Sequence, residues 1–191
     1  MNNAEVQYLK EAQASRVPIC CRGFFEERDL AALEVWAATL TYRPVPAWLG
    51  NFSFRLFGEA YGKTHGLLPQ DIRELVDRMM GVVPDQKFTT VFVQRYREGE
   101  LVRPHRDPRD NVGYTLIAVL GDFEGAETKI YGDDDDGSTK IQLRRGDLFR
   151  LPCTIGGVQG PKHEVSAVTR GTRYALILNT IETRQSGLFS T

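Results

Sequence analysis

The chain has 191 residues and a formal net charge of −1, so we expect one soluble domain whose overall charge does not attract nucleic acid. No stretch approaches about 18 apolar residues and the N-terminus is polar, which argues against a membrane span or secretory signal and favours a cytoplasmic protein. The three cysteines form neither a disulfide framework nor a zinc-finger spacing, and Cys153 is expected to be inert packing.

The first half of the chain, residues 1–87, is predicted to be rich in helices. Residues 26–40 carry apolar side chains near the helical period and acidic residues at their start. Residues 69–84 repeat this pattern, with a proline at the beginning and a glycine near the end. Between them, residues 51–65 combine aromatic and basic side chains with glycines, which predicts a strand or a hairpin.

The second half, residues 88–182, shows the pattern of short strands separated by turn residues, and residues 183–191 form a tail. Many short strands at this spacing predict a sandwich or a small barrel. The fold class is therefore α+β, mainly β, in a single domain. The predicted strands are 88–96, 114–121, 127–132, 139–147, 147–152, 163–168 and 172–182.

The stretch "VRPHRDPRDN" is a candidate metal-binding segment. In a strand, residues two apart point to the same face, so His105 and Asp107 can both face one metal ion. The alternative is a charged turn on the surface. A third ligand has to be His65 or His163, and His163 is favoured because it opens a later strand that can return beside the pair. Two histidines and one carboxylate with open positions suit a non-haem Fe(II) oxygenase.

Arg173 supports this interpretation from the last predicted strand. The inward face of this strand is expected to carry Arg173, Ala175, Ile177 and Asn179. A lone buried cation such as Arg173 costs several kcal/mol unless a carboxylate pairs with it. The remote carboxylate of 2-oxoglutarate fits the fork of an arginine while the other end of the molecule chelates iron. On the strand 88–96, Gln94 and Tyr96 share a face and can hydrogen-bond the same co-substrate.

The segments "VQRYREGELVRPHRD", "GDLFRL" and "HEVSAVTRGTRYALIL" resemble the Fe(II)/2-oxoglutarate-dependent dioxygenase superfamily, over residues 88–182. The resemblance implies a double-stranded β-helix, or jelly-roll, core. It also implies Fe(II), 2-oxoglutarate and O2 as cofactor and co-substrates. On this resemblance, the iron ligands and catalytic residues are His105, Asp107 and His163, and 2-oxoglutarate is bound by Arg173, Tyr96 and Gln94.

Within the superfamily, "QRYREG" is similar to a strand of the AlkB-type nucleic-acid demethylases, and "FSFRLFGEAYG" is similar to their nucleotide-recognition lid. Ala175, Asn179 and Gln94 depart from the AlkB pattern, which has asparagine, arginine and asparagine at these places. The segments "LGDFEGAETKIYG" and "HEVSAVTRGTRYAL" are similar to hydroxylases of the TET/JBP type and to prolyl-4-hydroxylase-like members.

The expected reaction is hydroxylation of a C–H bond, with succinate and CO2 as co-products. The favoured substrate is a methylated or modified nucleobase in single-stranded or flipped form, because aromatic side chains stack on bases and arginines bind phosphates. The candidate substrate-binding residues are Arg55, Phe57, Tyr61 and Arg106. Alternatively, these aromatic residues belong to the core and the arginines to a solvated surface.

Two other functions stay open at this point. One is a dioxygenase that hydroxylates an amino acid, a peptide or a small metabolite, which the near-neutral charge fits equally well. The other is a non-catalytic jelly-roll module that keeps the metal site for binding or structure. An arginine that faces open metal positions argues against the second, because a structural module has no use for a carboxylate-binding cation.

Overall fold

The computed structural model describes residues 16–60, 63–132 and 137–182. Within these ranges the chain forms two helices and three antiparallel β-sheets. The helices are α2 (Glu27–Thr39) and α3 (Gln70–Met80). The strands of the first half are β1 (Ile19–Cys21), β2 (Arg43–Pro44), β3 (Ser53–Ala60), β4 (Lys63–His65) and β5 (Thr90–Tyr96). Those of the second half are β6 (Val102–His105), β7 (Asn111–Leu120), β8 (Phe123–Gly125), β9 (Thr128–Tyr131), β10 (Ser138–Ile141), β11 (Leu148–Pro152), β12 (His163–Val165), β13 (Val168–Gly171) and β14 (Arg173–Ile181).

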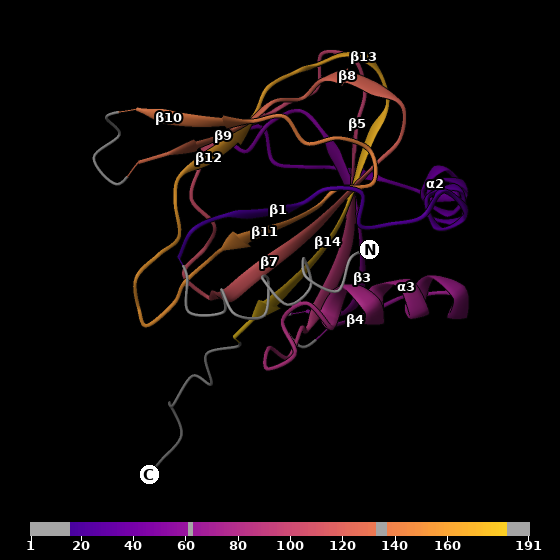
Figure 1. The fold of residues 1–191 in the computed structure, drawn as a ribbon, viewed down its shortest axis with the longest axis horizontal. Coiled ribbons are helices and arrows are strands. Elements are labelled where there is room, and N and C mark those ends of the chain that lie inside the picture. The colour runs from indigo at the N-terminus through magenta and orange to yellow at the C-terminus, as the bar shows by residue number, and fades with distance from the viewer. Residues whose placement is uncertain (1–15, 61–62, 133–136, 183–191) are drawn as a thin grey trace.

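The largest sheet has the strand order β1-β11-β7-β14-β5-β3-β2, and β4 pairs with β3 at the edge. A second sheet has the order β10-β9-β12-β6, and β8 pairs with β13 in a short ribbon. The second sheet lies above the large one in Figure 1, with β9, β10 and β12 over β1, β11 and β7. Two facing antiparallel sheets with crossing connections form a jelly-roll sandwich.

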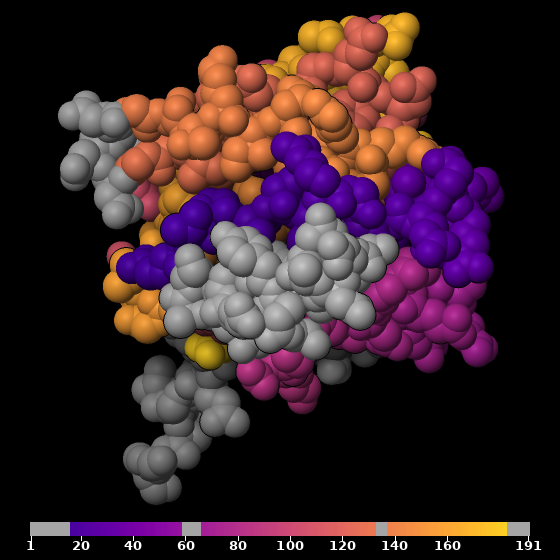
Figure 2. Space-filling view, viewed as in Figure 1, coloured from indigo at the N-terminus to yellow at the C-terminus, as the bar shows by residue number. Residues whose placement is uncertain are grey.

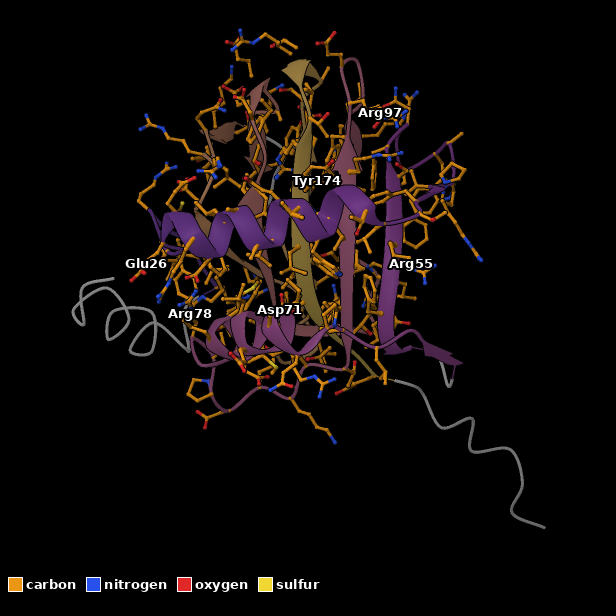
Figure 3. All side chains as sticks on the ribbon, turned by 90° about the vertical axis from the view of Figure 1, so that its right-hand side faces the viewer. Glu26, Arg55, Asp71, Arg78, Arg97 and Tyr174 are labelled. Atoms are coloured by element: carbon orange, nitrogen blue, oxygen red, sulfur yellow. The ribbon has the colours of Figure 1, made fainter. Side chains whose placement is uncertain are left out.

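The two helices cover the outer face of the large sheet. Figure 3 shows α2 and α3 crossing in front of its strands, and in Figure 2 their atoms adjoin on the right-hand side. The α2 side chains Leu30 and Leu33 pack in one buried cluster with Leu116 of β7 and Leu176 of β14. This layer of apolar contacts fixes the central strands from behind and leaves their other face for the site. No helix in the described ranges is long and apolar enough to span a membrane.

The central strands alternate between the two faces, and this alternation positions the site. On β14 the side chains of Arg173, Ala175, Ile177 and Asn179 line the space between the sheets, as the sequence predicted. Leu176 faces the helices instead, where it is fully buried. Because side chains alternate along β14, Arg173 and Asn179 face the space between the sheets, whereas Leu176 on the same strand packs in the core beneath the helices.

The predicted elements agree with the structure in the long segments. Both predicted helices are present, and residues 53–60 and 63–65 form strands as expected for the hairpin. The strand predicted over 139–147 is shorter, because Gln142–Asp147 leave the sheet and turn toward β11. Residues 53–58 of β3 pair with β5, and β2 and β4 pair with the other side of β3, so this part of the segment expected to be a lid belongs to the large sheet.

Candidate metal centre and active-site cleft

Three predicted ligands meet between the two sheets. His105 is the last residue of β6, His163 is the first residue of β12, and the two are directly paired across these strands. Asp107 follows two residues after His105, just beyond the end of β6. One ligand atom from each residue lies within 4.8 Å of the others, and the imidazole centroids are 4.4 Å apart. We call His105, Asp107 and His163 the metal cluster.

Backbone carbonyls fix which imidazole nitrogens face the centre. His105 Nδ1 lies 2.9 Å from the carbonyl oxygen of Arg103, and His163 Nδ1 lies 3.1 Å from that of Pro161. Because a carbonyl oxygen only accepts, each Nδ1 carries the proton and each Nε2 keeps its lone pair. Burial and the adjacent His163 ring lower the pKa of His105, which favours the neutral, ligating form.

The donor set fits a divalent iron. Two neutral imidazoles and one carboxylate form the arrangement that leaves open positions on Fe(II). His105 Nε2 and Asp107 Oδ1 are 3.8 Å apart, a distance that two metal bonds of about 2.1 Å can join. The residues that the structure brings together therefore form a complete candidate site for this metal.

The second carboxylate oxygen of Asp107 is held by Cys153. The Sγ of Cys153 lies 3.2 Å from Asp107 Oδ2 and 3.0 Å from the hydroxyl oxygen of Thr115. Burial and the charge of Asp107 raise the pKa of Cys153, so the thiol is neutral and donates to the carboxylate. Gln159 Nε2 donates to the backbone carbonyl of Asp107 as well. Cys153 was expected to be inert packing, but it contacts a candidate metal ligand.

Arg173 is a buried cation in the cavity that the metal cluster lines. It is 2% exposed, and its Nε and Nη1 have no hydrogen-bond partner. Its guanidinium lies 4.9 Å from the ring centroid of Tyr96 and donates to the Tyr96 hydroxyl. The Tyr96 hydroxyl in turn donates to Gln94 Oε1. Burial raises the pKa of Tyr96 to about 12, so it stays a neutral donor.

This inner cavity has a volume of about 80 Å³. Burial lowers the pKa of Arg173, yet a guanidinium starts so far above neutrality that it stays charged. Two donors on a charged, buried group without a carboxylate partner form a binding position for an anion. The predicted residues Arg173, Tyr96 and Gln94 thus lie together on one wall, with the metal cluster in the same lining.

Two further polar side chains in the inner cavity were not assigned a role from the sequence. Asn111 of β7 is 4% exposed and Asn179 of β14 is 8% exposed, and the Oδ1 of each lacks a hydrogen-bond partner. Both line the inner cavity and also the wider cleft that leads to it. Buried amides without partners are rare in folded proteins, so these groups are available to a bound molecule.

The wider cleft, here called the outer cleft, has a volume of about 370 Å³ and shares His105 and Asp107 with the inner cavity. Its walls are mostly apolar, and Trp48 at the wall is 70% exposed. The apolar residues of its lining are Val45, Pro46, Trp48, Leu49, Phe52, Phe54, Leu56, Phe92, Pro108 and Ile181. A substrate in this cleft therefore meets apolar and aromatic walls before it reaches the metal cluster.

The predicted substrate-binding residues are distributed differently from expectation. Arg106 lines the outer cleft, where Nη1 donates to the carbonyl oxygen of Gly160 at 2.6 Å. Phe57 is not in the cleft: it is 4% exposed and packs against Trp36 on the helix side of the large sheet. Arg55 lies in a neighbouring hollow, and Tyr61 lies outside the described residues. The period of two along β3 explains this, because Phe54 and Leu56 face the cleft instead.

Comparison with known proteins gives the fold. No protein-family model and no curated protein matches the sequence. Among solved structures, a 2OG-Fe(II) oxygenase family oxidoreductase from Burkholderia pseudomallei is 16% identical, with a TM-score of 0.73 over 96% of both chains.

Two more structures extend this likeness. A prolyl hydroxylase from Trichoplax adhaerens, in complex with a hypoxia inducible factor peptide fragment, is 14% identical with a TM-score of 0.71. That match covers 100% of this chain and 98% of the other. The structure of OsALKBH1 is also 14% identical, with a TM-score of 0.65 over 85% of this chain and 97% of the other. The predicted jelly-roll is confirmed: the chain has the fold of the 2OG-Fe(II) oxygenases, with a His-Asp-His cluster between its two sheets.

Proposed function

We propose that the chain is an Fe(II)- and 2-oxoglutarate-dependent dioxygenase that hydroxylates a C–H bond of a bound substrate. The observation that carries this proposal is the cation Arg173, buried in the same cavity as the metal cluster with Nε and Nη1 unpaired. A metal site alone would not require such a cation. A dicarboxylate that chelates the metal at one end supplies the missing partner at the other.

The residues have separate tasks in this reaction. His105, Asp107 and His163 hold the metal and leave its remaining positions open. When bound, the iron couples the oxidative decarboxylation of 2-oxoglutarate to hydroxylation, so that R–H, O2 and 2-oxoglutarate give R–OH, succinate and CO2. Arg173 and Tyr96 hold the remote carboxylate and thereby orient the keto acid toward the metal cluster.

The substrate that we propose is a modified nucleobase. Trp48, Phe54 and Phe92 offer aromatic faces along the outer cleft, and bases stack on such faces. At the inner end, the amides of Asn111 and Asn179 can hydrogen-bond the edge of a base beside the metal cluster. Hydroxylation of an N-methyl group there would release formaldehyde, whereas hydroxylation of a C-methyl group would leave a stable alcohol.

A second candidate substrate is an amino acid, a peptide or a small metabolite. The observation in its favour is the predominantly apolar lining of the outer cleft, in which Arg106 and Asp110 are the charged residues beyond the metal cluster. A neutral, apolar ligand fits such walls without a phosphate partner. The peptide complex of the Trichoplax prolyl hydroxylase places a peptide on this fold in that protein.

The test is succinate formation by the purified chain with Fe(II), ascorbate and 2-oxoglutarate, with His105→Ala as the blank. Methylated single-stranded oligonucleotides form one panel, and proline-containing peptides and free amino acids form a second. We expect succinate to rise with a methylated oligonucleotide. A rise with the second panel alone would refute the proposed nucleobase substrate but would still support the oxygenase activity. No succinate above the blank under any condition would refute the oxygenase.

A further inference from the structure

A chain of hydrogen-bonded side chains runs from the wall of the inner cavity to a member of the metal cluster. The Nδ2 of Asn111 lies 3.3 Å from Thr115 Oγ1, and this oxygen lies 3.0 Å from Cys153 Sγ. The Sγ of Cys153 in turn lies 3.2 Å from Asp107 Oδ2. We call Asn111, Thr115 and Cys153 the relay. All three are buried, so their hydrogen bonds lie in a medium of low dielectric constant, where they are stronger than in water.

The donors of the relay all point toward Asp107. A metal-binding carboxylate only accepts, so the thiol of Cys153 donates its one hydrogen to Oδ2. The hydroxyl of Thr115 therefore donates to the sulfur, since the thiol has no second hydrogen to give. Because its own hydrogen is used, Thr115 Oγ1 accepts from the amide of Asn111. Hydrogen bonds in such a head-to-tail series polarise one another, so the first two strengthen the last.

A bulge in β7 brings the first two members of the relay together. Asn111 and Thr115 are four residues apart, which in a regular strand separates two side chains by about 13 Å. The register between β7 and β14 shifts across residues 112–116, where Gly113 has a φ of 74°. The carbonyl oxygen of Gly113 accepts from the backbone N–H of Cys153, so the same bulge holds Cys153 beside Thr115. Bulges next to active sites re-aim side chains in this way.

The two carboxylate oxygens of Asp107 have different surroundings. Oδ1 lies 3.8 Å from His105 Nε2, whereas Oδ2 accepts from the thiol of Cys153. A carboxylate that bound the metal through both oxygens would fill one of the positions that two histidines and one carboxylate leave open on Fe(II). The keto acid and O2 need these positions. A hydrogen bond on Oδ2 therefore favours the coordination that the proposed reaction requires.

We propose that Asn111 and Thr115 are positioning residues that act through Cys153 to keep Asp107 Oδ2 off the metal, so that this ligand binds through Oδ1 alone. The proposal rests on the proposed function, because it assigns the relay to the iron of that reaction. It extends the site to side chains that contact neither the metal nor 2-oxoglutarate. If the relay served only to satisfy buried polar groups, its last acceptor would be paired within the protein.

The far end of the relay is instead open toward the substrate. The Oδ1 of Asn111 has no hydrogen-bond partner among the described residues, and Asn111 lines both the inner cavity and the outer cleft. A molecule in the cleft that donates an N–H or O–H to this oxygen makes the amide a stronger donor to Thr115. The effect passes along the relay to Asp107 Oδ2. Substrate binding at Asn111 is thereby linked to a metal ligand that the substrate need not contact.

The test compares metal binding by the full chain and its variants, without turnover. Mn(II) affinity is measured by calorimetric titration, and the visible absorption of the Co(II)-loaded chain reports the number and geometry of the metal ligands. Thr115→Val keeps the shape of the side chain and removes the hydroxyl. It should weaken Mn(II) binding about fivefold, the effect of one ordinary hydrogen bond, and change the Co(II) spectrum. Thr115→Ser keeps the hydroxyl and should restore both.

The matched control is Thr128→Val. Thr128 of β9 is buried like Thr115, it also lines the inner cavity, and its Oγ1 has no hydrogen-bond partner among the described residues. The control therefore removes the same group from the same cavity at a place outside the relay. Its Mn(II) affinity and Co(II) spectrum should be those of the wild type.

A double-mutant cycle tests whether Thr115 acts through the thiol. Cys153→Ala should weaken Mn(II) binding more than Thr115→Val does, and Thr115→Val added to Cys153→Ala should weaken it no further. Asn111→Ala removes the donor one step further from the metal. It should weaken Mn(II) binding about twofold in the wild-type background and leave it unchanged in the Cys153→Ala background.

Three outcomes overturn the proposal. They are wild-type affinity and spectrum in Thr115→Val, the same changes in Thr128→Val, and additive losses in the double variant. The oxygenase is scored separately, by the succinate assay described above. Losses of metal affinity that follow the relay, in a wild type that forms no succinate, keep the relay and overturn the oxygenase. Succinate formation together with undiminished metal binding in Thr115→Val does the reverse.

Discussion

Arg173→Met removes the buried cation while it keeps a long, apolar side chain in the same space, so it isolates the role of the charge. In the wild type, Arg173 has two unpaired N–H groups for a carboxylate. A hydrogen bond to a charged group contributes about 1.5–3 kcal/mol, so two lost bonds at the lower value amount to about 3 kcal/mol. The KM for 2-oxoglutarate should therefore rise roughly 10²-fold.

Thermal unfolding gives a readout that does not depend on turnover. With Mn(II) and 2-oxoglutarate at about 100 times its Kd, the wild type should gain about 2.7 kcal/mol. For a chain of this size that corresponds to a rise in Tm of roughly 5–10 °C. Arg173→Met should lose this rise, yet without 2-oxoglutarate its Tm should equal or exceed that of the wild type, because a lone buried cation no longer has to be desolvated. Arg173→Lys keeps the charge but not the planar pair of donors, so its 2-oxoglutarate-dependent rise in Tm should lie between those of the wild type and Arg173→Met. An undiminished 2-oxoglutarate-dependent rise in Arg173→Met would refute the assigned role.

Further expectations concern the metal cluster, its support and the cleft. Alanine at any member of the metal cluster should abolish Mn(II) binding in a calorimetric titration while the circular dichroism spectrum stays that of the wild type; retained affinity would contradict the ligand assignment. Cys153→Ala should weaken Mn(II) binding about tenfold or more, whereas Cys153→Ser keeps a donor to the carboxylate and should restore it. Equal affinities of the two variants would show that the thiol does not position this ligand. Asn179→Ala should raise the KM for the substrate about tenfold and leave the KM for 2-oxoglutarate unchanged, because its amide also lines the outer cleft and lies six residues along β14 from Arg173. The reverse pattern would assign the amide to the keto acid. Gly160→Ala should lower the free energy of unfolding by about 2 kcal/mol or more, because its β-carbon would lie 2.1 Å from the Pro152 carbonyl oxygen. A denaturant titration with the midpoint of the wild type would show that this backbone adapts.

The long central strands could be predicted because each carries enough residues for its alternation to be recognised. On β14, the inward set from Arg173 to Asn179 follows directly from the period of two. The short strands β1, β2, β8 and β13 have two to four residues and carry no such signal. Their positions depend on pairing with distant strands, as β1 pairs with β11, and a single sequence does not encode that pairing in any local pattern.

The same physics explains what was found and missed at the site. The ligands of the metal cluster could be predicted because their residue types are specific and the chain has three histidines. Phe57 was assigned to the substrate because an aromatic segment alone does not fix its register, and a shift of one residue exchanges the two faces. The contact of Cys153 with Asp107 joins the ends of β11 and β6, and it depends on the tertiary arrangement of two different sheets.

The inner cavity and the outer cleft share His105, Asp107, Asn111 and Asn179 in their walls, so the two spaces adjoin at the metal cluster. If 2-oxoglutarate enters the inner cavity through the outer cleft, a substrate seated in that cleft blocks its way to Arg173. We therefore expect a compulsory order in which 2-oxoglutarate enters first and the substrate closes the site behind it. Succinate, held at the same depth, would leave after the hydroxylated product, and excess substrate would slow each cycle by trapping the succinate-bound protein.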